Sequence, residues 1–318
     1  MLLNIGDLVK HRRAELGLTQ AQVAEGVCSR ETLSQLEHNK TLPQLFVIDK
    51  VLDKLALDGA TLLTLPASKQ NIYSLKKQAE IYSLMYQAEK SPRDGGEQLK
   101  LALETLVSDS EIDESYKQFL LNFGYTHLYI YSETERNLPL AQERAFRFLR
   151  QYRPDFDLSK LGTYYLTSTE LNIINRLSYL YRLKGECETA IDILNASKSF
   201  QEAKQLDRDL RGLRPIYVST LMHLADTYLL FERFEEALAL VDVYYALIKE
   251  HDSLKLVMKF LYVQCLALLN LGQKATGVAV FDKICLLHET VDNTFIQLDP
   301  ERPDVREWMA YVKQTHEV

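Results

Sequence analysis

The sequence predicts an all-α fold, in which a small N-terminal helical bundle is followed by a longer array of helix pairs. Three observations support this prediction. Only 12 Gly and 8 Pro occur among 318 residues, which leaves few positions for the tight turns of a many-stranded sheet. Leu, Ala, Glu, Lys and Gln, which favour helices, are abundant. Apolar residues make up 47% of the chain, which is ample for a packed core.

The four cysteines are scattered without CxxC spacing, and each lies in an apolar helical pattern. We interpret them as reduced core residues and expect neither disulfides nor a metal site. The N-terminal residues lack the pattern of a secretion signal, and no later run reaches about 18 uncharged apolar residues. We therefore expect a cytoplasmic protein that does not enter a membrane.

The net charge of −7 argues against non-specific binding to nucleic acids, because affinity for phosphates comes from clustered Lys and Arg. The charges of residues 1–60 are nearly balanced, and the acidic excess lies mostly after them. Any binding of DNA must therefore be a local property of the N-terminal part.

Residues 5–16 have apolar side chains at helical spacing, and Gly17 ends this first predicted helix as a C-terminal cap. Thr19 followed by Gln22 is a capping-box pattern, which predicts the start of a second helix. Gly26 ends that helix within about two turns.

Ser29 is the next candidate N-cap, and a third helix is predicted from Arg30 toward Asn39. Leu33 and Leu36 lie on its buried face. The sequence therefore predicts two short helices joined by a tight turn.

A fourth predicted helix follows Pro43 and supplies the apolar stripe that closes a small helical core. We expect this first domain to span residues 1–65. A linker is predicted at 66–71, where Pro, Ser and Asn occur together, and a repeat domain at 72–318.

The segment GLTQAQVAEGVCSRETLSQLEHNKTLP resembles the phage-repressor (XRE) type of helix-turn-helix. The shared elements are a Gln at the start of the second helix, a small residue within it, an apolar residue in the turn, and adjacent apolar and acidic residues in the third helix. These positions are Gln20, Ala24, Val27, Leu36 and Glu37.

The resemblance implies a buried ion pair between Arg13 and Glu37, and a third helix that lies in the major groove with its N-terminal side chains at base edges. Arg can bond guanine bidentately, Gln can bond adenine, and Glu can accept from cytosine. An ordinary solvated helix face remains the alternative. The implied DNA-binding residues are Ser29, Arg30, Glu31 and Gln35 at the groove, with Gln20 and Lys40 at phosphates.

Beyond the linker, long helical stripes alternate with short breaks at 91–96, 137–139, Gly185, Gly272 and 300–303, which predicts antiparallel helix pairs. Two of these pairs share a motif, in which a large ring follows a small residue by three positions and an Ala follows the ring on the next helix. The motif consists of Ser178, Tyr181 and Ala190 in one copy and of Ala225, Tyr228 and Ala237 in the next.

Small residues let two helices approach closely while the aromatic ring fills the wedge between them, as in tetratricopeptide repeats. A weaker third copy contains Cys265, Leu268 and Gly277, and a fourth, around Gly124, needs an insertion before its second helix. The intervals exceed the roughly 34 residues of the ideal repeat. We expect a superhelical array with a concave binding surface.

A helix-turn-helix of this type followed by degenerate tetratricopeptide repeats resembles the RNPP family (Rgg, NprR, PlcR and PrgX), the peptide-responsive transcriptional regulators of Gram-positive bacteria. The segment GVCSRETLSQLEHNKTLP is particularly close to the DNA-binding consensus of that family, whereas the repeats match in pattern and length. The resemblance implies a homodimer that binds double-stranded DNA and a short signalling peptide, as in quorum sensing, without a cofactor.

A peptide would lie on the face of each first repeat helix that points to the concave side. Polar side chains at this face suit the backbone of an extended peptide, because amides both donate and accept. A solvated groove, or internal pairs between these residues, remains the alternative. The candidate peptide-binding residues are Asn172, Asn175, Tyr179 and Arg182, then Ser219, Met222 and Asp226, then Lys259 and Tyr262.

Other classes of function have weaker support. The sequence has no GxGxxG, P-loop, HExxH or GxSxG motif, so we expect no catalytic residues and no enzymatic activity. The 18 tyrosines lie mostly within apolar stripes, which indicates core packing instead of base stacking. The open alternative is a phage-type repressor or toxin–antitoxin-like regulator whose helical domain only dimerises or binds a protein partner.

Overall fold

The computed structural model describes residues 5–57, 69–151, 153–203, 214–247, 254–290 and 314. All regular structure in these ranges is helical, which confirms the predicted all-α fold. None of the helices in the same ranges is long and apolar enough to cross a membrane. The chain divides into two compact units: unit 1 is Met1–Leu180 with Ser199–Ile216, and unit 2 is Tyr181–Lys198 with Tyr217–Val318.

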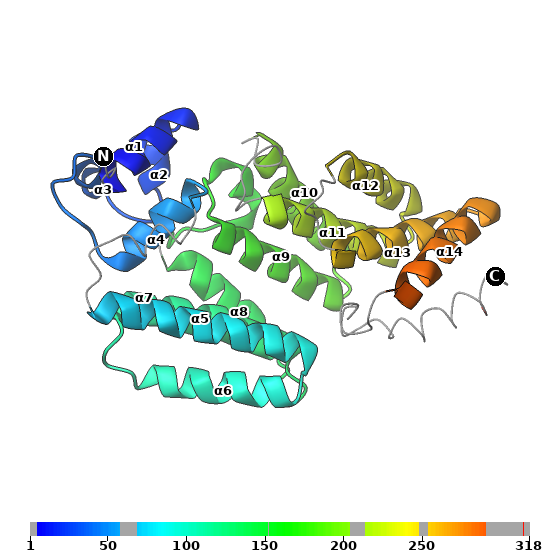
Figure 1. The fold of residues 1–318 in the computed structure, drawn as a ribbon, viewed down its shortest axis with the longest axis horizontal. Helices are drawn as coiled ribbons and strands as arrows, with labels where there is room; N and C mark the ends of the chain where they lie inside the picture. Colours follow the sequence, from blue (N-terminus) through cyan, green and yellow to red (C-terminus); the bar gives the residue numbers. More distant parts are fainter. Residues whose placement is uncertain are drawn as a thin grey trace. The chain divides into compact units, whose positions relative to one another are not determined.

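Unit 1 begins with four short helices (Figure 1), which are α1 (Ile5–Glu15), α2 (Gln20–Ala24), α3 (Arg30–Glu37) and α4 (Leu45–Lys54). Gly17 follows α1 with φ +65°, as the predicted cap requires. The capping box at α2 is also confirmed, because Thr19 Oγ1 accepts from the Gln22 backbone nitrogen at 3.2 Å and Gln22 Oε1 accepts from the Thr19 nitrogen at 2.9 Å.

The helix α3 starts where the sequence predicts. Ser29 Oγ accepts from the backbone nitrogen of Thr32 at 3.0 Å and caps the helix. Leu33 and Leu36 are buried, and the stripe of α4 covers them. The resulting core contains Val9, Leu18, Val23, Ala24, Val27, Leu33, Leu36, Ile48, Val51, Leu52 and Leu55, together with Tyr165 from much later in the chain.

The rest of unit 1 is built from paired helices, in which α5 packs beside α6 and α7, and α7 packs beside α6 and α8. Of the predicted linker, residues 66–68 lie outside the described part of the chain, and 69–71 already belong to α5. The elements are α5 (Lys69–Lys90), α6 (Asp94–Val107), α7 (Glu114–Tyr131), α8 (Leu138–Arg150), the 3₁₀ helix η2 (Leu158–Thr163) and α9 (Ser168–Leu183).

The predicted break at 91–96 is shorter than expected, because α6 begins at Asp94. Gly95 and Gly96 therefore lie inside the helix. A Cβ on Gly95 would lie 2.6 Å from the backbone carbonyl carbon of Gln87 in α5. These glycines permit close packing of two helices, and the helix pair predicted around this break is confirmed with a shorter turn than expected.

In unit 2, α12 packs against α13, and α13 against α14. Ala225, Tyr228 and Ala237 share one apolar core, as the repeat motif predicts. Gly185 and Gly272 both have φ +75° and end the first helix of their pairs. The helices are α10 (Cys187–Ala203), which begins in unit 2, α11 (Arg214–Leu230), α12 (Phe234–Leu247), α13 (Leu254–Asn270) and α14 (Lys274–Thr290).

Candidate DNA-reading helix and ligand-facing helices

The predicted buried ion pair holds α3 to α1. Arg13 Nε lies 2.5 Å from Glu37 Oε1, and Arg13 Nη2 lies 2.9 Å from Glu37 Oε2, while Glu37 is only 2% exposed. Gln20 Nε2 donates to the same carboxylate at 2.9 Å. Burial by itself would raise the pKa of Glu37, but the hydrogen bonds from Arg13 and Gln20 outweigh burial and hold that pKa below its usual value. The pair is confirmed and fixes the angle of α3.

The N-terminal turn of α3 presents its polar side chains to solvent. Arg30 and Glu31 are exposed, and no other residue of the described ranges pairs with the Arg30 guanidinium. Gln35 is partly exposed, and its Nε2 lies 3.4 Å from Glu31 Oε1. Ser29, the N-cap of α3, and Lys40, three residues after its end, are both exposed. Gln20 differs from these residues, since its amide nitrogen is occupied by the buried carboxylate of α3.

The candidate peptide-binding residues all lie on first helices of pairs. On α9, Asn172 is partly exposed, whereas Asn175 and Tyr179 are buried. The Tyr179 ring stacks on Tyr131 of α7 with centroids 6.2 Å apart. The further candidates are Arg182 at the end of α9, which is buried, Ser219, Met222 and Asp226 on α11, and Lys259 and Tyr262 on α13.

The candidates assigned to unit 2 differ in exposure. Ser219 and Lys259 are partly exposed, and Asp226 is buried. Met222 and Tyr262 belong to apolar core clusters, so their side chains pack largely inside their helix pairs. No group of three or more potential metal ligands occurs among the described residues.

A polar cluster that was not predicted from the sequence joins three helices of unit 1. His127 of α7 is 1% exposed, and its Nε2 lies 2.8 Å from the carbonyl oxygen of Met85 in α5. Arg176 of α9 contacts His127 Nδ1. Because a guanidinium only donates, Nδ1 must accept and the proton must reside on Nε2. Burial and the nearby Arg176 charge lower the pKa of His127 well below its usual value, so the imidazole is neutral.

The spacing of α9 contained a signal for this cluster. Arg176 lies four residues after Asn172 and three before Tyr179, which places all three on one face of the helix. The predicted peptide-binding set contains Asn172 and Tyr179 and lacks the cation between them.

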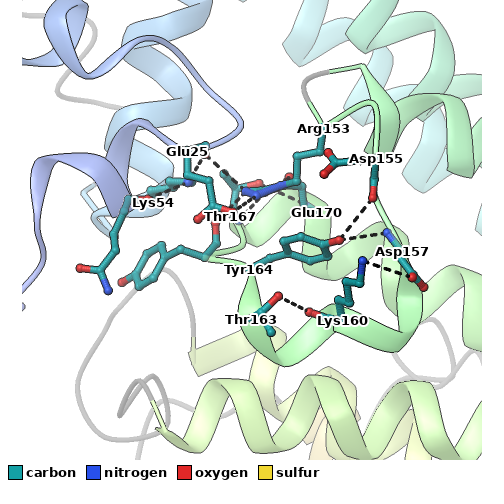
Figure 2. Close-up of polar contacts among 12 residues, drawn as sticks. Glu25, Lys54, Arg153, Asp155, Asp157, Lys160, Thr163, Tyr164, Thr167 and Glu170 are labelled. Atoms are coloured by element: carbon teal, nitrogen blue, oxygen red, sulfur yellow. Dashed lines mark hydrogen bonds and ion pairs between the residues drawn. The ribbon is translucent and has the colours of Figure 1, made fainter.

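A second cluster joins the helix-turn-helix to the repeats within unit 1. Figure 2 shows Arg153 between the end of α2 and the start of α9. Its Nη1 lies 3.1 Å from Glu25 Oε1, its Nε lies 3.3 Å from Glu170 Oε1, and its Nη2 donates to the Tyr165 carbonyl at 2.9 Å. Arg153 is 4% exposed, and a Cβ on Gly26 would lie 2.7 Å from its Cζ. The glycine of the turn thus gives the guanidinium room to reach α2.

The end of α4 contributes to the same junction. The carboxylate of Asp53 accepts from the backbone nitrogens of Ser168 and Thr169 at 3.3 and 3.4 Å and from both hydroxyls, so it caps the N-terminus of α9. Lys54 is 1% exposed and donates to the Gln22 and Glu25 carbonyl oxygens. Burial, assisted by the Arg153 charge, lowers the pKa of Lys54 to about 8.

Aromatic packing completes the junction. The Phe46 ring of α4 makes edge contacts with Tyr116 and Phe119 of α7, with centroids 5.6 and 5.5 Å apart. Lys50 Nζ lies 3.9 Å from the centroid of Phe119. The helix-turn-helix is therefore packed against α7 and α9, which are first helices of their pairs.

Comparisons with known proteins agree with this geometry. Residues 9–62 match the helix-turn-helix family HTH_3. The chain is similar in structure to PlcR of Bacillus thuringiensis, solved in complex with the peptide PapR7 and DNA, with TM-score 0.55 and 18% identity over 90% of this chain and 95% of PlcR. This likeness confirms the fold class, a helix-turn-helix followed by tetratricopeptide-like helix pairs.

Two further structures align over most of both chains. The apo form of the competence regulator ComR from Streptococcus vestibularis has TM-score 0.48 and 15% identity over 99% of this chain and 98% of ComR. The Streptococcus dysgalactiae SHP pheromone receptor Rgg2 has TM-score 0.41 and 12% identity over 99% of each chain. A comparison with curated proteins finds no match.

Proposed function

We propose that this chain is a sequence-specific transcriptional regulator whose repeat region binds a short signalling peptide that changes DNA binding or activation. The proposal of DNA binding rests mainly on the exposed N-terminal turn of α3, which is held in place by the buried pair of Arg13 and Glu37. The likeness of the whole fold to PlcR, which was solved with a peptide and DNA, supports the peptide half.

Recognition of DNA rests on side chains that carry readout groups and face solvent. The proposed base-reading residues are Ser29, Arg30, Glu31 and Gln35, with Gln20 and Lys40 at phosphates. Among them, Arg30 has a guanidinium that pairs with no described residue. It lies at the N-terminal end of α3, which in this motif enters the major groove. Its fork matches guanine O6 and N7.

The test begins with selection of a binding site from random duplex DNA by the full chain. Arg30→Ala should then weaken binding to the selected site by about 1–3 kcal/mol, roughly 5- to 150-fold, and should weaken binding to random DNA less. Arg147→Ala, an exposed arginine on α8, serves as a control that should leave both affinities unchanged. An equal loss on both DNAs makes Arg30 a phosphate contact, and failure to enrich any site rules out sequence-specific regulation.

The peptide half rests on polar groups along the first helices. The nine residues expected from the sequence remain the proposed set, and its members that are accessible without rearrangement are Asn172, Ser219 and Lys259. Their amide, hydroxyl and ammonium groups can bond the backbone of an extended peptide.

We place the coupling between peptide and DNA in the geometry of a homodimer. Two α3 helices must meet half-sites about 34–36 Å apart, so a small change in the repeats can align or misalign them. Asn172→Ala should weaken peptide binding without altering peptide-free DNA affinity, as measured by gel-shift titrations with and without a retained peptide. A loss of DNA affinity in the absence of peptide would make Asn172 a structural residue. A protein that binds DNA but retains no peptide would instead be a repressor whose repeats only dimerise or bind a protein partner.

A further inference from the structure

The guanidinium of Arg176 on α9 contacts no carboxylate among the described residues. Its contacts are Nδ1 of His127 and the faces of Phe123 and Tyr131, whose centroids lie 5.1 and 6.0 Å from Cζ. The side chain is partly buried. None of these contacts is a carboxylate, since the imidazole is neutral and the rings offer only the negative faces of their π-systems. The carboxylate of Glu89 in α5 lies at the other ring nitrogen of His127, with Oε1 3.7 Å from Nε2.

Two other arginines of unit 1 that are partly or fully buried are neutralised by carboxylates. Arg13 binds the carboxylate of Glu37, and Arg153 binds those of Glu25 and Glu170. A cation that has lost part of its hydration without gaining a counterion retains a strong preference for an anion. Arg176 is a cation of this kind.

The neighbours of Arg176 hold its guanidinium in a fixed position. His127 is fixed because its Nε2 donates to the Met85 carbonyl, so its Nδ1 presents a lone pair to the guanidinium. One N–H of Arg176 is thereby taken, and the others of the fork remain available. His127 acts as a positioning residue for the cation.

The face of α9 around this cation is the one proposed to contact peptide. Asn172 lies one turn before Arg176 and is partly exposed, and Tyr179 lies one turn after it. A guanidinium fork binds a carboxylate with two parallel hydrogen bonds. The amide of Asn172 can donate to or accept from the adjoining peptide group.

We propose that Arg176 forms a carboxylate subsite that binds the C-terminal end of a peptide ligand, which fixes the direction in which the peptide lies along α9. This inference rests on the proposed function, because it names the chemistry by which the repeat region recognises a peptide. Every linear peptide supplies one terminal carboxylate, whereas side-chain carboxylates depend on its sequence.

The experiment uses the full chain, immobilised, and random heptapeptide libraries synthesised without Asp or Glu. One library ends in a free carboxylate and the other in a carboxamide, and retained peptides are quantified by mass spectrometry. The wild-type chain should retain the free-acid library about tenfold or more over the amide library, as expected for a charge-assisted hydrogen bond. Arg176→Gln should abolish this preference.

Arg144→Gln is the matched control. Arg144 is also a partly buried guanidinium, with its Cζ 4.9 Å from the Tyr125 centroid, but it lies on α8, the second helix of its pair. This variant should keep the preference for the free acid. The comparison of the two libraries on the wild-type chain needs no variant and so does not depend on whether Arg176→Gln folds.

The outcomes separate this inference from the proposed function. Equal retention of both libraries by the wild-type chain overturns the carboxylate subsite and leaves peptide binding intact. Retention of neither library contradicts peptide binding itself, and the subsite with it. A preference that survives in a folded Arg176→Gln variant also overturns the assignment. A third library would be amidated and contain Glu. If it is retained as well as the free-acid library, Arg176 binds a side-chain carboxylate and the proposal that it binds the C-terminal carboxylate is overturned.

Discussion

Replacement of Arg153 by Met tests how the helix-turn-helix is held against the repeats. Met keeps most of the aliphatic length and removes only the charged fork. The change leaves Glu170, whose side chain is 11% exposed, with the Thr167 backbone nitrogen at 2.7 Å as its remaining partner. The side chain of Glu25, the other carboxylate, is 41% exposed, so water can hydrate it when Arg153 is replaced.

The two ion pairs should therefore contribute unequally. Removing one partner of a buried pair costs about 3–5 kcal/mol, and the retained Thr167 hydrogen bond favours the lower end of that range for Glu170. Glu25 lies on the solvent side of this cluster, and Arg153 keeps Glu170 as its counterion when Glu25 is replaced, so Glu25→Gln should cost little, about 0–1 kcal/mol. Arg153→Met is expected to lower the free energy of unfolding of unit 1 by about 3 kcal/mol. Arg153→Met combined with Glu170→Gln should recover part of that loss, because no buried charge is then left unpaired.

Hydrogen exchange measured by mass spectrometry is the suitable assay, since a chain of two units need not unfold in one step. Amides of α2 and of the first turns of α9 should exchange about 100-fold faster in Arg153→Met than in the wild-type chain, which corresponds to about 3 kcal/mol. Circular dichroism at 222 nm should show unchanged helix content. If Arg153→Met and Glu25→Gln accelerate exchange equally and by less than about fivefold, the buried pair does not stabilise this junction.

Two further changes test carboxylates of the helix-turn-helix. Glu37→Ala leaves Arg13 without its partner and should destabilise the helix-turn-helix by roughly 3 kcal/mol, and an unchanged melting temperature would show that the pair is not stabilising. Burial raises the pKa of Asp49 to about 6, above its unfolded value of about 4, so the folded state binds this proton more tightly. The stability that comes from this proton is present at acidic pH and is lost as the pH rises from about 4 to 6. Asp49→Asn should therefore raise the free energy of unfolding at pH 7.5 by about 3 kcal/mol and flatten its pH dependence in that window. Chemical denaturation from pH 4 to 8 measures this. The same slope of unfolding free energy against pH in both proteins would contradict the prediction.

The helix-turn-helix was predictable because its signals are local. Thr19 with Gln22, and Ser29 with Thr32, satisfy backbone groups within three residues, so the sequence displays both ends of each bond. The repeats of unit 2 were predictable for a related reason, since close helix packing requires a small residue such as Ala225 at a fixed distance from a ring.

The junction was not predictable from such patterns. Arg153 and Glu25 are 128 positions apart, and Asp53 and Ser168 are 115 apart. No periodicity relates residues at these separations, and the charges of α4 look like those of any solvated helix face. The predicted break between α5 and α6 ran to residue 96, past the start of α6 at Asp94, because Gly95 serves helix packing in the structure, whereas glycine more often indicates a turn.

The cap that Asp53 places on α9 bears on the exchange of DNA-binding domains between regulators. The first N–H groups of a helix lack partners within it, and here a residue of the helix-turn-helix supplies acceptors for two of them. A hybrid protein that joined a foreign helix-turn-helix to residues 69–318 would lose this carboxylate unless the donor domain had an acidic residue at the end of its fourth helix. Domain grafting onto this chain therefore requires a graft that keeps Asp53, and a hybrid without it would begin α9 with unsatisfied amides.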